Sequence, residues 1–177
     1  MSLGKEYLNI IHVRFKHVKS LGEKTLTQLT EQEIHWALNQ ESNSVSMIVK
    51  HMSGNMLSRW TDFLYSDGEK PDRDRDSEFI EDYPSKLELM LVWEKGWECL
   101  FTTLGSLTEE DLLKTITIRG EKHIALDAIE RQLAHYACHV GQMVYIGKQL
   151  KDDQWKTLSI PRGASEQYLK EMLAKHD

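Results

Sequence analysis

Two histidines, His135 and His139, stand one helical turn apart in a segment whose apolar residues recur at helical spacing. On an α-helix, residues four positions apart share a face, so both imidazoles could bind one metal ion with little strain. The H-E-x-x-H zinc motif has the same spacing, but no glutamate lies between these two histidines to act as a base. The pair alone is a weak motif, since two half-buried histidines without a metal would look the same. A third ligand is needed.

A single histidine, His51, is the candidate third ligand. It lies in a second amphipathic stretch, predicted to form a helix from a cap at residue 43 or 44 to about residue 65. The polar stripe through His51 also contains Asn55 and borders the apolar face. Such a stripe is usually exposed to solvent, but here it places a histidine at a helix edge, as in the pair near the C-terminus.

The long helix that carries the histidine pair has an apolar arc that we expect to face the core. His135 and His139 lie at one edge of this arc, on the same stripe as Arg131 and Gln142. A helix edge beside a core is where a helical bundle can build a site open to water on one side. The predicted arc consists of Leu126, Ile129, Leu133, Ala137, Val140 and Val144.

The remaining pattern predicts the elements that must hold these helices together. Alternating apolar and polar residues around Gly120 predict a small β-hairpin over Thr115–Ile124. We therefore expect an all-α fold, a four-helix bundle with a β-hairpin crossover before the last long helix, in a single domain over residues 1–177. Long helices are predicted at about residues 4–29, 44–65, 84–107 and 126–150, and a short terminal helix at about 165–175.

One stretch, from Asp67 to Pro84, breaks the helical periodicity and alternates in charge through its middle. Mixed charge runs of this kind usually form a solvated surface loop. The alternative is an ordered loop over one end of the bundle, and long loops of this type are often functional. The order of its acidic residues does not match that of a calcium-binding loop.

Composition limits the class of protein. Hydrophobic residues make up 40% of the 177 residues and charged residues 28%, which is typical of a globular domain with a substantial core. The net charge of −6 argues against nucleic acid binding over the whole chain. Cys99 and Cys138 have neither zinc-finger nor CxxC spacing, so we expect two reduced thiols. With no secretory signal or membrane span, a cytoplasmic location is expected.

The sequence resembles the DinB-like family of metal-dependent four-helix-bundle proteins, relatives of the bacillithiol- and mycothiol-dependent transferases. A single histidine, a long gap and a histidine pair follow the ligand order of that family. Residues 48–55, Ile-Val-Lys-His-Met-Ser-Gly-Asn, are similar to its second-helix motif, and residues 134–142 to its fourth-helix motif. Three further segments resemble an uncharacterised branch of the family: residues 58–63, 67–71 and 159–163.

The resemblance implies that His51, His135 and His139 hold one divalent metal ion and leave a position open. Neutral imidazoles suit several metals, of which zinc and nickel are favoured here. The implied activity is that of a metal-dependent enzyme, either a low-molecular-weight thiol S-transferase or a hydrolase, acting on a small molecule. The resemblance also implies a homodimer. From the net charge and the lack of a long apolar run, we expect neither nucleic acid nor membrane as a partner.

Three polar residues are candidates to support the ligands or to anchor a substrate: Asn55, Arg131 and Gln142. No catalytic residue is assigned, because Asp62 is only a weak candidate for a general base. Two alternatives remain open at this point. One is a bundle that binds a metal or a small ligand without catalysis, and the other is a stress-response interaction protein with a vestigial site.

Overall fold

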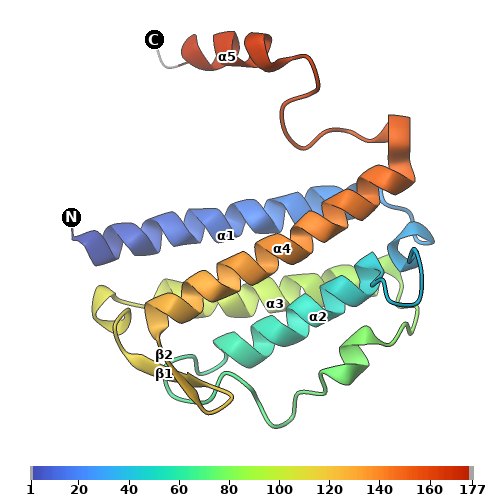
Figure 1. Cartoon of the computed structure of the whole chain (residues 1–177). Helices are drawn as coiled ribbons and strands as arrows, with labels where there is room; N and C mark the ends of the chain where they lie inside the picture. The colour runs from blue at the N-terminus through green and yellow to red at the C-terminus, as the bar shows by residue number, and fades with distance from the viewer. Residues whose placement is uncertain (1, 176–177) are drawn as a thin grey trace.

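Four long α-helices lie side by side and make up most of the molecule (Figure 1). The computed structural model describes residues 2–175. Across these residues the chain forms five α-helices and one two-stranded hairpin, so the predicted mostly helical fold is confirmed. The long helices are α1 (Leu3–Gln28), α2 (Val45–Trp60), α3 (Lys86–Ser106) and α4 (Ala125–Lys151).

Local capping explains where α2 begins and ends. The Ser44 hydroxyl accepts a hydrogen bond from the backbone N–H of Met47, which satisfies one of the free donors of the first turn. The helix ends at Trp60, about five residues earlier than predicted. Two positions later, Asp62 has a φ of 49°, a left-handed conformation that cannot continue a right-handed helix.

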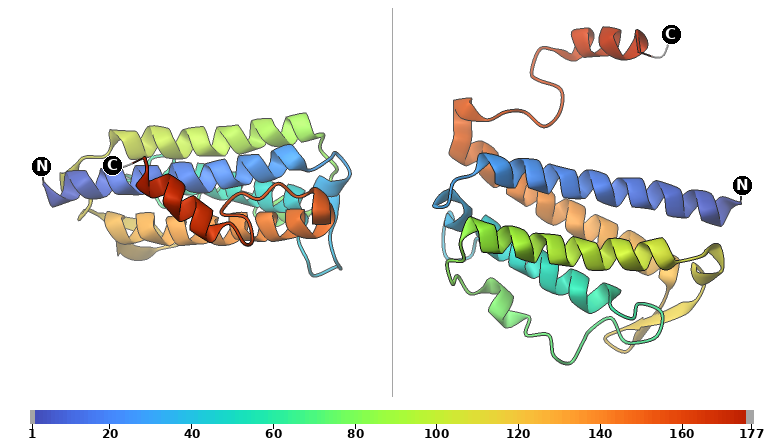
Figure 2. Two further views of the ribbon diagram at one scale, coloured as in Figure 1. Left: turned by 90° about the horizontal axis from the view of Figure 1, so that it is seen from above. Right: turned by 180° about the vertical axis from the view of Figure 1, so that it is seen from behind.

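Aromatic side chains fill the centre of the molecule. Phe15 of α1, Trp60 of α2, Trp97 of α3 and Tyr136 of α4 are all fully buried. The Phe15 and Trp60 ring centroids are 5.7 Å apart and those of Trp97 and Tyr136 5.9 Å, each pair edge to face. Helix α2 packs against α3, and α1 packs against α4 (Figure 2). The histidine-bearing helices α2 and α4 both contribute to this core, which fixes their relative positions.

The buried face of α4 is rotated relative to the predicted apolar arc. Tyr136 is fully buried, whereas Ala137, which we expected in the core, is exposed. Tyr136 can be buried because its hydroxyl accepts a hydrogen bond from Trp60 Nε1 and donates one to Asn55 Oδ1. Since His135 precedes Tyr136, the rotation brings His135 to the side of α4 that faces α2.

The hairpin between α3 and α4 forms where it was predicted. Strands β1 (Thr115–Ile118) and β2 (Glu121–Ile124) pair antiparallel, with Thr115 opposite Ile124. Arg119 and Gly120 form the two-residue turn, and both have positive φ, at 55° and 78°. This left-handed turn matches the twist of the two strands, and glycine adopts it without strain.

The charged loop between α2 and α3 packs against the rest of the molecule. The Asp67 carboxylate accepts hydrogen bonds from the backbone N–H groups of Arg119 and Gly120, which ties the loop to the hairpin turn. The loop also forms a short 3₁₀ helix, η2 (Asp76–Phe79), in which Glu78 is buried. This segment is therefore not a purely solvated loop. It is ordered, as the alternative predicted, but it runs along α2 and not over one end of the long helices (Figure 1).

The last helix, α5 (Ser165–Leu173), projects away from the four long helices (Figure 1). None of its residues is buried. It follows an extended segment that leaves the end of α4, so α5 makes no contribution to the core between the long helices.

Two further predictions concern the environment of the chain. Cys99 is partly buried, Cys138 is exposed, and both are free thiols, as predicted. None of the helices within residues 2–175 combines the length and the apolar character that crossing a membrane requires.

Candidate metal centre

Three imidazole rings converge where α2 faces α4. The Nε2 atoms of His51 and His135 are 3.3 Å apart, and those of His135 and His139 are 3.0 Å apart. One ring nitrogen from each histidine lies within 4.8 Å of the other two. Two nitrogens at tetrahedral positions, each about 2.0–2.1 Å from a zinc ion, would be roughly 3.3–3.4 Å apart. The cluster therefore has the dimensions of a three-histidine metal site.

Glu78 fixes the ring of His51 from the opposite side. The Nδ1 atom of His51 lies 2.9 Å from Glu78 Oε2, and both side chains are buried. An ionised carboxylate can only accept, so the Nδ1 atom carries the proton and donates it. The lone pair of His51 then resides on Nε2, which faces the other two histidines. A carboxylate behind a histidine is the usual arrangement in metal sites, where it sets the tautomer and the ring orientation.

Arg73 in turn holds Glu78 with two parallel hydrogen bonds. Arg73 Nε is 2.8 Å from Glu78 Oε1, and Arg73 Nη2 is 2.9 Å from Glu78 Oε2. Burial alone would raise the pKa of Glu78, but the hydrogen bonds from His51 and Arg73 outweigh burial and hold that pKa below its ordinary value. Gly54, one turn after His51, makes room for this carboxylate, because a Cβ atom there would overlap Glu78 Oε1.

His139 is fixed by a residue of its own helix. Its Nδ1 atom lies 2.9 Å from Oε1 of Gln142, which is exposed to solvent. As assigned, the amide oxygen accepts the Nδ1 proton and leaves the Nε2 lone pair of His139 free for a metal. Gln142 thus performs for His139 the task that Glu78 performs for His51.

Burial keeps the imidazoles of His135 and His139 in the neutral form that binds metals. Burial, together with the neighbouring His139 and His51, lowers the pKa of His135 to about 3. The pKa of His139 is also lowered, chiefly by burial. Near pH 7 the imidazoles of His135 and His139 are therefore neutral, with one ring proton each, so each nitrogen that faces the cluster offers a lone pair. Three converging lone pairs repel one another unless a cation lies between them, so the donor set fits a divalent metal ion.

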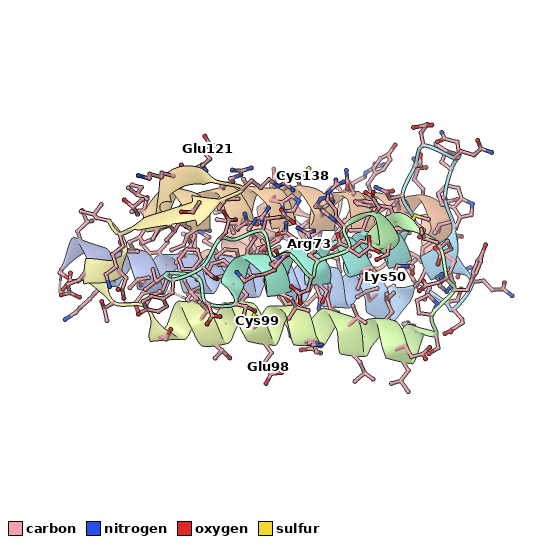
Figure 3. All side chains as sticks on the ribbon, turned by 90° about the horizontal axis from the view of Figure 1, so that it is seen from below. Lys50, Arg73, Glu98, Cys99, Glu121 and Cys138 are labelled. Atoms are coloured by element: carbon pink, nitrogen blue, oxygen red, sulfur yellow. The ribbon has the colours of Figure 1, made fainter. Side chains whose placement is uncertain are left out.

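A polar cavity of about 360 Å³ opens beside the cluster and is bounded by His51 and His135. Asn55 and Gln132 contribute amide groups to its lining, and the other lining residues are arginines. Arg73, one of these arginines, lies on the loop side of α2 and α4 in Figure 3. The cavity gives a small molecule access to the histidine nitrogens.

A second cavity, of about 580 Å³, lies along α4 on the side of Gln142. Trp36 lines it together with Cys138 and Tyr145. Most of its wall is apolar, in contrast with the arginine-lined cavity. The polar cavity is therefore lined by two of the three histidines, whereas the apolar cavity reaches Gln142, the partner of His139, and none of the three.

The structure places the three predicted supporting residues near the cluster in different roles. Gln142 contacts His139 directly, whereas Asn55 and Arg131 line the polar cavity, and Asn55 also accepts the Tyr136 hydroxyl. Asp62, the weak candidate for a base, is exposed and lines neither of the two cavities.

Sequence reasoning missed Glu78, Arg73 and Gly54. Glu78 is 27 residues from His51 in the chain and belongs to a stretch without periodicity, so no spacing rule connects the two. One signal was present in the sequence: a glycine at 54, in the interior of a predicted helix and one turn after the candidate ligand. A glycine at such a position indicates that another group approaches the helix closely.

Comparison with known proteins gives a match at the level of a protein family. A family model described as "Protein of unknown function (DUF1572)" matches residues 2–164, which is nearly the whole chain. No curated protein and no solved structure matches the sequence. The match extends from the start of α1 through α4 and includes all three histidines.

Proposed function

We propose that this chain is a metal-dependent enzyme whose divalent ion is held by three histidines. The chain belongs to the DUF1572 family, which is part of the DinB-like superfamily. One observation carries this proposal: the Nε2 atoms of His51, His135 and His139 converge at distances that suit one ion. The side-by-side packing of α1–α4 supports a DinB-like four-helix bundle as the scaffold.

The residues around the cluster orient the histidines, and a bound metal would supply the chemistry. Glu78 and Gln142 hold the Nδ1 protons of His51 and His139, which keeps both Nε2 lone pairs directed inward. When bound, zinc or nickel supplies a Lewis acid that lowers the pKa of a water molecule or thiol in its open position. The three neutral imidazoles add no negative charge, so the site keeps its full attraction for an anionic nucleophile.

The reaction that we propose is the transfer of a low-molecular-weight thiol to an electrophile. The thiolate sulfur forms a bond to an electrophilic carbon, and the leaving group departs with the electron pair of the broken bond. The polar cavity, lined by His51 and His135, and the apolar cavity, lined in part by Gln142, provide separate spaces for two reactants, which supports a transfer. Hydrolysis, with water in place of the thiol, is the alternative reaction at the same site.

A turnover assay tests the enzyme proposal against a non-catalytic site. The purified chain, without a histidine tag, is incubated with a small thiol and a chloronitrobenzene electrophile, and product is measured before and after treatment with a chelator. We expect turnover that the chelator removes and that zinc or nickel restores. A panel of thiols and ester substrates that yields no metal-dependent turnover would favour the non-catalytic alternative. The homodimer and the cytoplasmic location remain predictions.

A further inference from the structure

The polar cavity beside the histidine cluster concentrates the arginines of the chain. Five of the seven arginines in the sequence line it, and none of the fifteen lysines does. They come from four separate segments of the chain, namely α2, the charged loop, the hairpin turn and α4. The five are Arg59, Arg73, Arg75, Arg119 and Arg131.

The positive charge of this cavity is only partly compensated. Among the residues that the structure describes, no acidic side chain lines it. Two glutamates behind the wall form its ion pairs: Glu69 with Arg59, Arg73 and Arg119, and Glu78 with Arg73. Five guanidinium groups against two carboxylates leave an excess of three positive charges, in a chain whose net charge is −6. Such a local excess attracts an anion into the cavity.

Two of the arginines are committed to the structure. The Arg59 and Arg73 side chains are each only 5% exposed, and their guanidinium groups are held by Glu69 and Glu78. Because both guanidinium groups are buried and ion-paired, they form a fixed, positively charged part of the cavity lining.

Two other arginines are available to a ligand. Within residues 2–175, neither Arg75 nor Arg131 forms an ion pair. The Arg75 guanidinium lies 5.0 Å from the centre of the Phe79 ring, which positions it without using its hydrogen-bond donors. Arg131 is exposed on α4, one turn before His135. Each of these planar guanidinium groups can donate two parallel hydrogen bonds to an oxyanion, which the ammonium group of lysine cannot do.

A buried amide gives a second indication that a ligand belongs here. Gln132 is only 4% exposed and lines the cavity, yet its Oε1 atom has no hydrogen-bond partner within the described residues. Leaving a buried acceptor without a donor is costly, so such groups are normally satisfied. A hydroxyl group of the ligand beside the anionic group would supply that donor.

From this arrangement we infer that the cavity binds a dianionic oxyanion group of the substrate, either a phosphate monoester or a dicarboxylate. Arg75 and Arg131 donate hydrogen bonds to the oxygens of this group, while the buried arginines contribute a positive electrostatic potential. Because His51 and His135 form one wall, the anion anchors the substrate beside the histidine nitrogens. The inference deepens the proposed function, since it names the class of substrate that the metal site would act on.

Titration calorimetry on the metal-free full-length chain tests this inference. The probes are inorganic phosphate, phenyl phosphate, succinate and, as a monoanion, acetate. We expect the dianions to bind more tightly than acetate, and the R75Q/R131Q double variant to weaken dianion binding by at least about tenfold. Preference for phenyl phosphate or for succinate identifies which dianion is carried. Arginines outside the cavity provide the matched control, so an R14Q/R162Q variant should bind as the wild type does.

Three results would overturn the inference: no dianion binding by the wild type, equal binding of acetate, or equal loss in the control variant. The His139→Ala variant separates the two proposals, because His139 does not line the cavity. If this variant loses metal but keeps dianion binding, both proposals stand. If the wild type binds dianions through Arg75 and Arg131 but binds no metal, only the proposed function fails. If it binds metal but no dianion, only the inference fails.

Discussion

At one end of the histidine cluster, His51 is held by a buried carboxylate, whereas at the other end His139 is held by an exposed amide. Glu78 reaches His51 from a loop 27 residues away and is itself gripped by Arg73. Gln142 lies three residues from His139 on the same helix. One support depends on tertiary structure and desolvated charge, and the other on local helical geometry. The two ends should therefore respond very differently when their supports are removed.

The largest effect on a support is expected for Glu78→Gln. The amide keeps the shape of the side chain but loses its charge, so Arg73 and the Nδ1–H group of His51 can no longer both be satisfied. We expect metal affinity to fall by about 10–100-fold. The free energy of unfolding of the metal-free chain should fall by about 3–5 kcal/mol, since a buried ion pair is broken. Chelator competition and denaturant unfolding measure the two quantities.

A matched control for this variant exists on the same loop. Glu81 Oε1 lies 3.0 Å from His35 Nδ1, and both side chains are mostly buried, but His35 is not part of the cluster. Glu81→Gln should lower stability and leave metal affinity unchanged. If Glu81→Gln lowered metal affinity as much as Glu78→Gln, the role of Glu78 would be general stabilisation and not support of His51.

A smaller effect is expected for Gly54→Ala, which leaves the charges intact. The new Cβ would overlap Glu78 Oε1, so the carboxylate must shift and its bond to His51 must lengthen. We expect metal affinity to fall by up to about tenfold. Gly105→Ala is the control, because a Cβ there meets nothing within 4 Å. The control should gain roughly 0.5–1 kcal/mol of stability from the better helix former and keep its metal affinity.

The smallest effect is expected at the other end of the cluster, for Gln142→Ala. Water can replace the exposed amide as the acceptor of the His139 Nδ1 proton, so metal affinity should change by no more than about threefold. The same chelator competition measures it. A loss as large as that of Glu78→Gln would show that the two ends are supported equally and would remove the contrast between them.

The contrast also explains which parts of the site were predictable. The shared face of His135 and His139, and the stripe through His51, follow from helical periodicity, which is visible in the spacing of the apolar residues. Gln142 was found for the same reason, because it lies on the stripe of His139. Glu78 could not be found, because its approach to His51 depends on how the charged loop folds back over α2.

The fold was predictable to a similar degree. Apolar periodicity located the long helices, and Gly120 with its flanking alternation located the hairpin. The buried face of α4 was predicted with Ala137 in the core, but Tyr136 is buried instead. A tyrosine can enter a core only if its hydroxyl finds partners, and those partners, Trp60 and Asn55, belong to another helix. Contacts between helices of this kind are not visible in periodicity.

Metal content is the measurement that tests the central claim most directly. Protein purified without a histidine tag is dialysed against zinc or nickel and analysed for bound ions, for the wild type and for His51→Ala, His135→Ala and His139→Ala. We expect one ion per wild-type chain, and in each variant a loss of affinity beyond the roughly 10–100-fold of a missing support. His12→Ala and His17→Ala, outside the cluster, should bind as the wild type does. Full metal content in all three cluster variants would contradict the account.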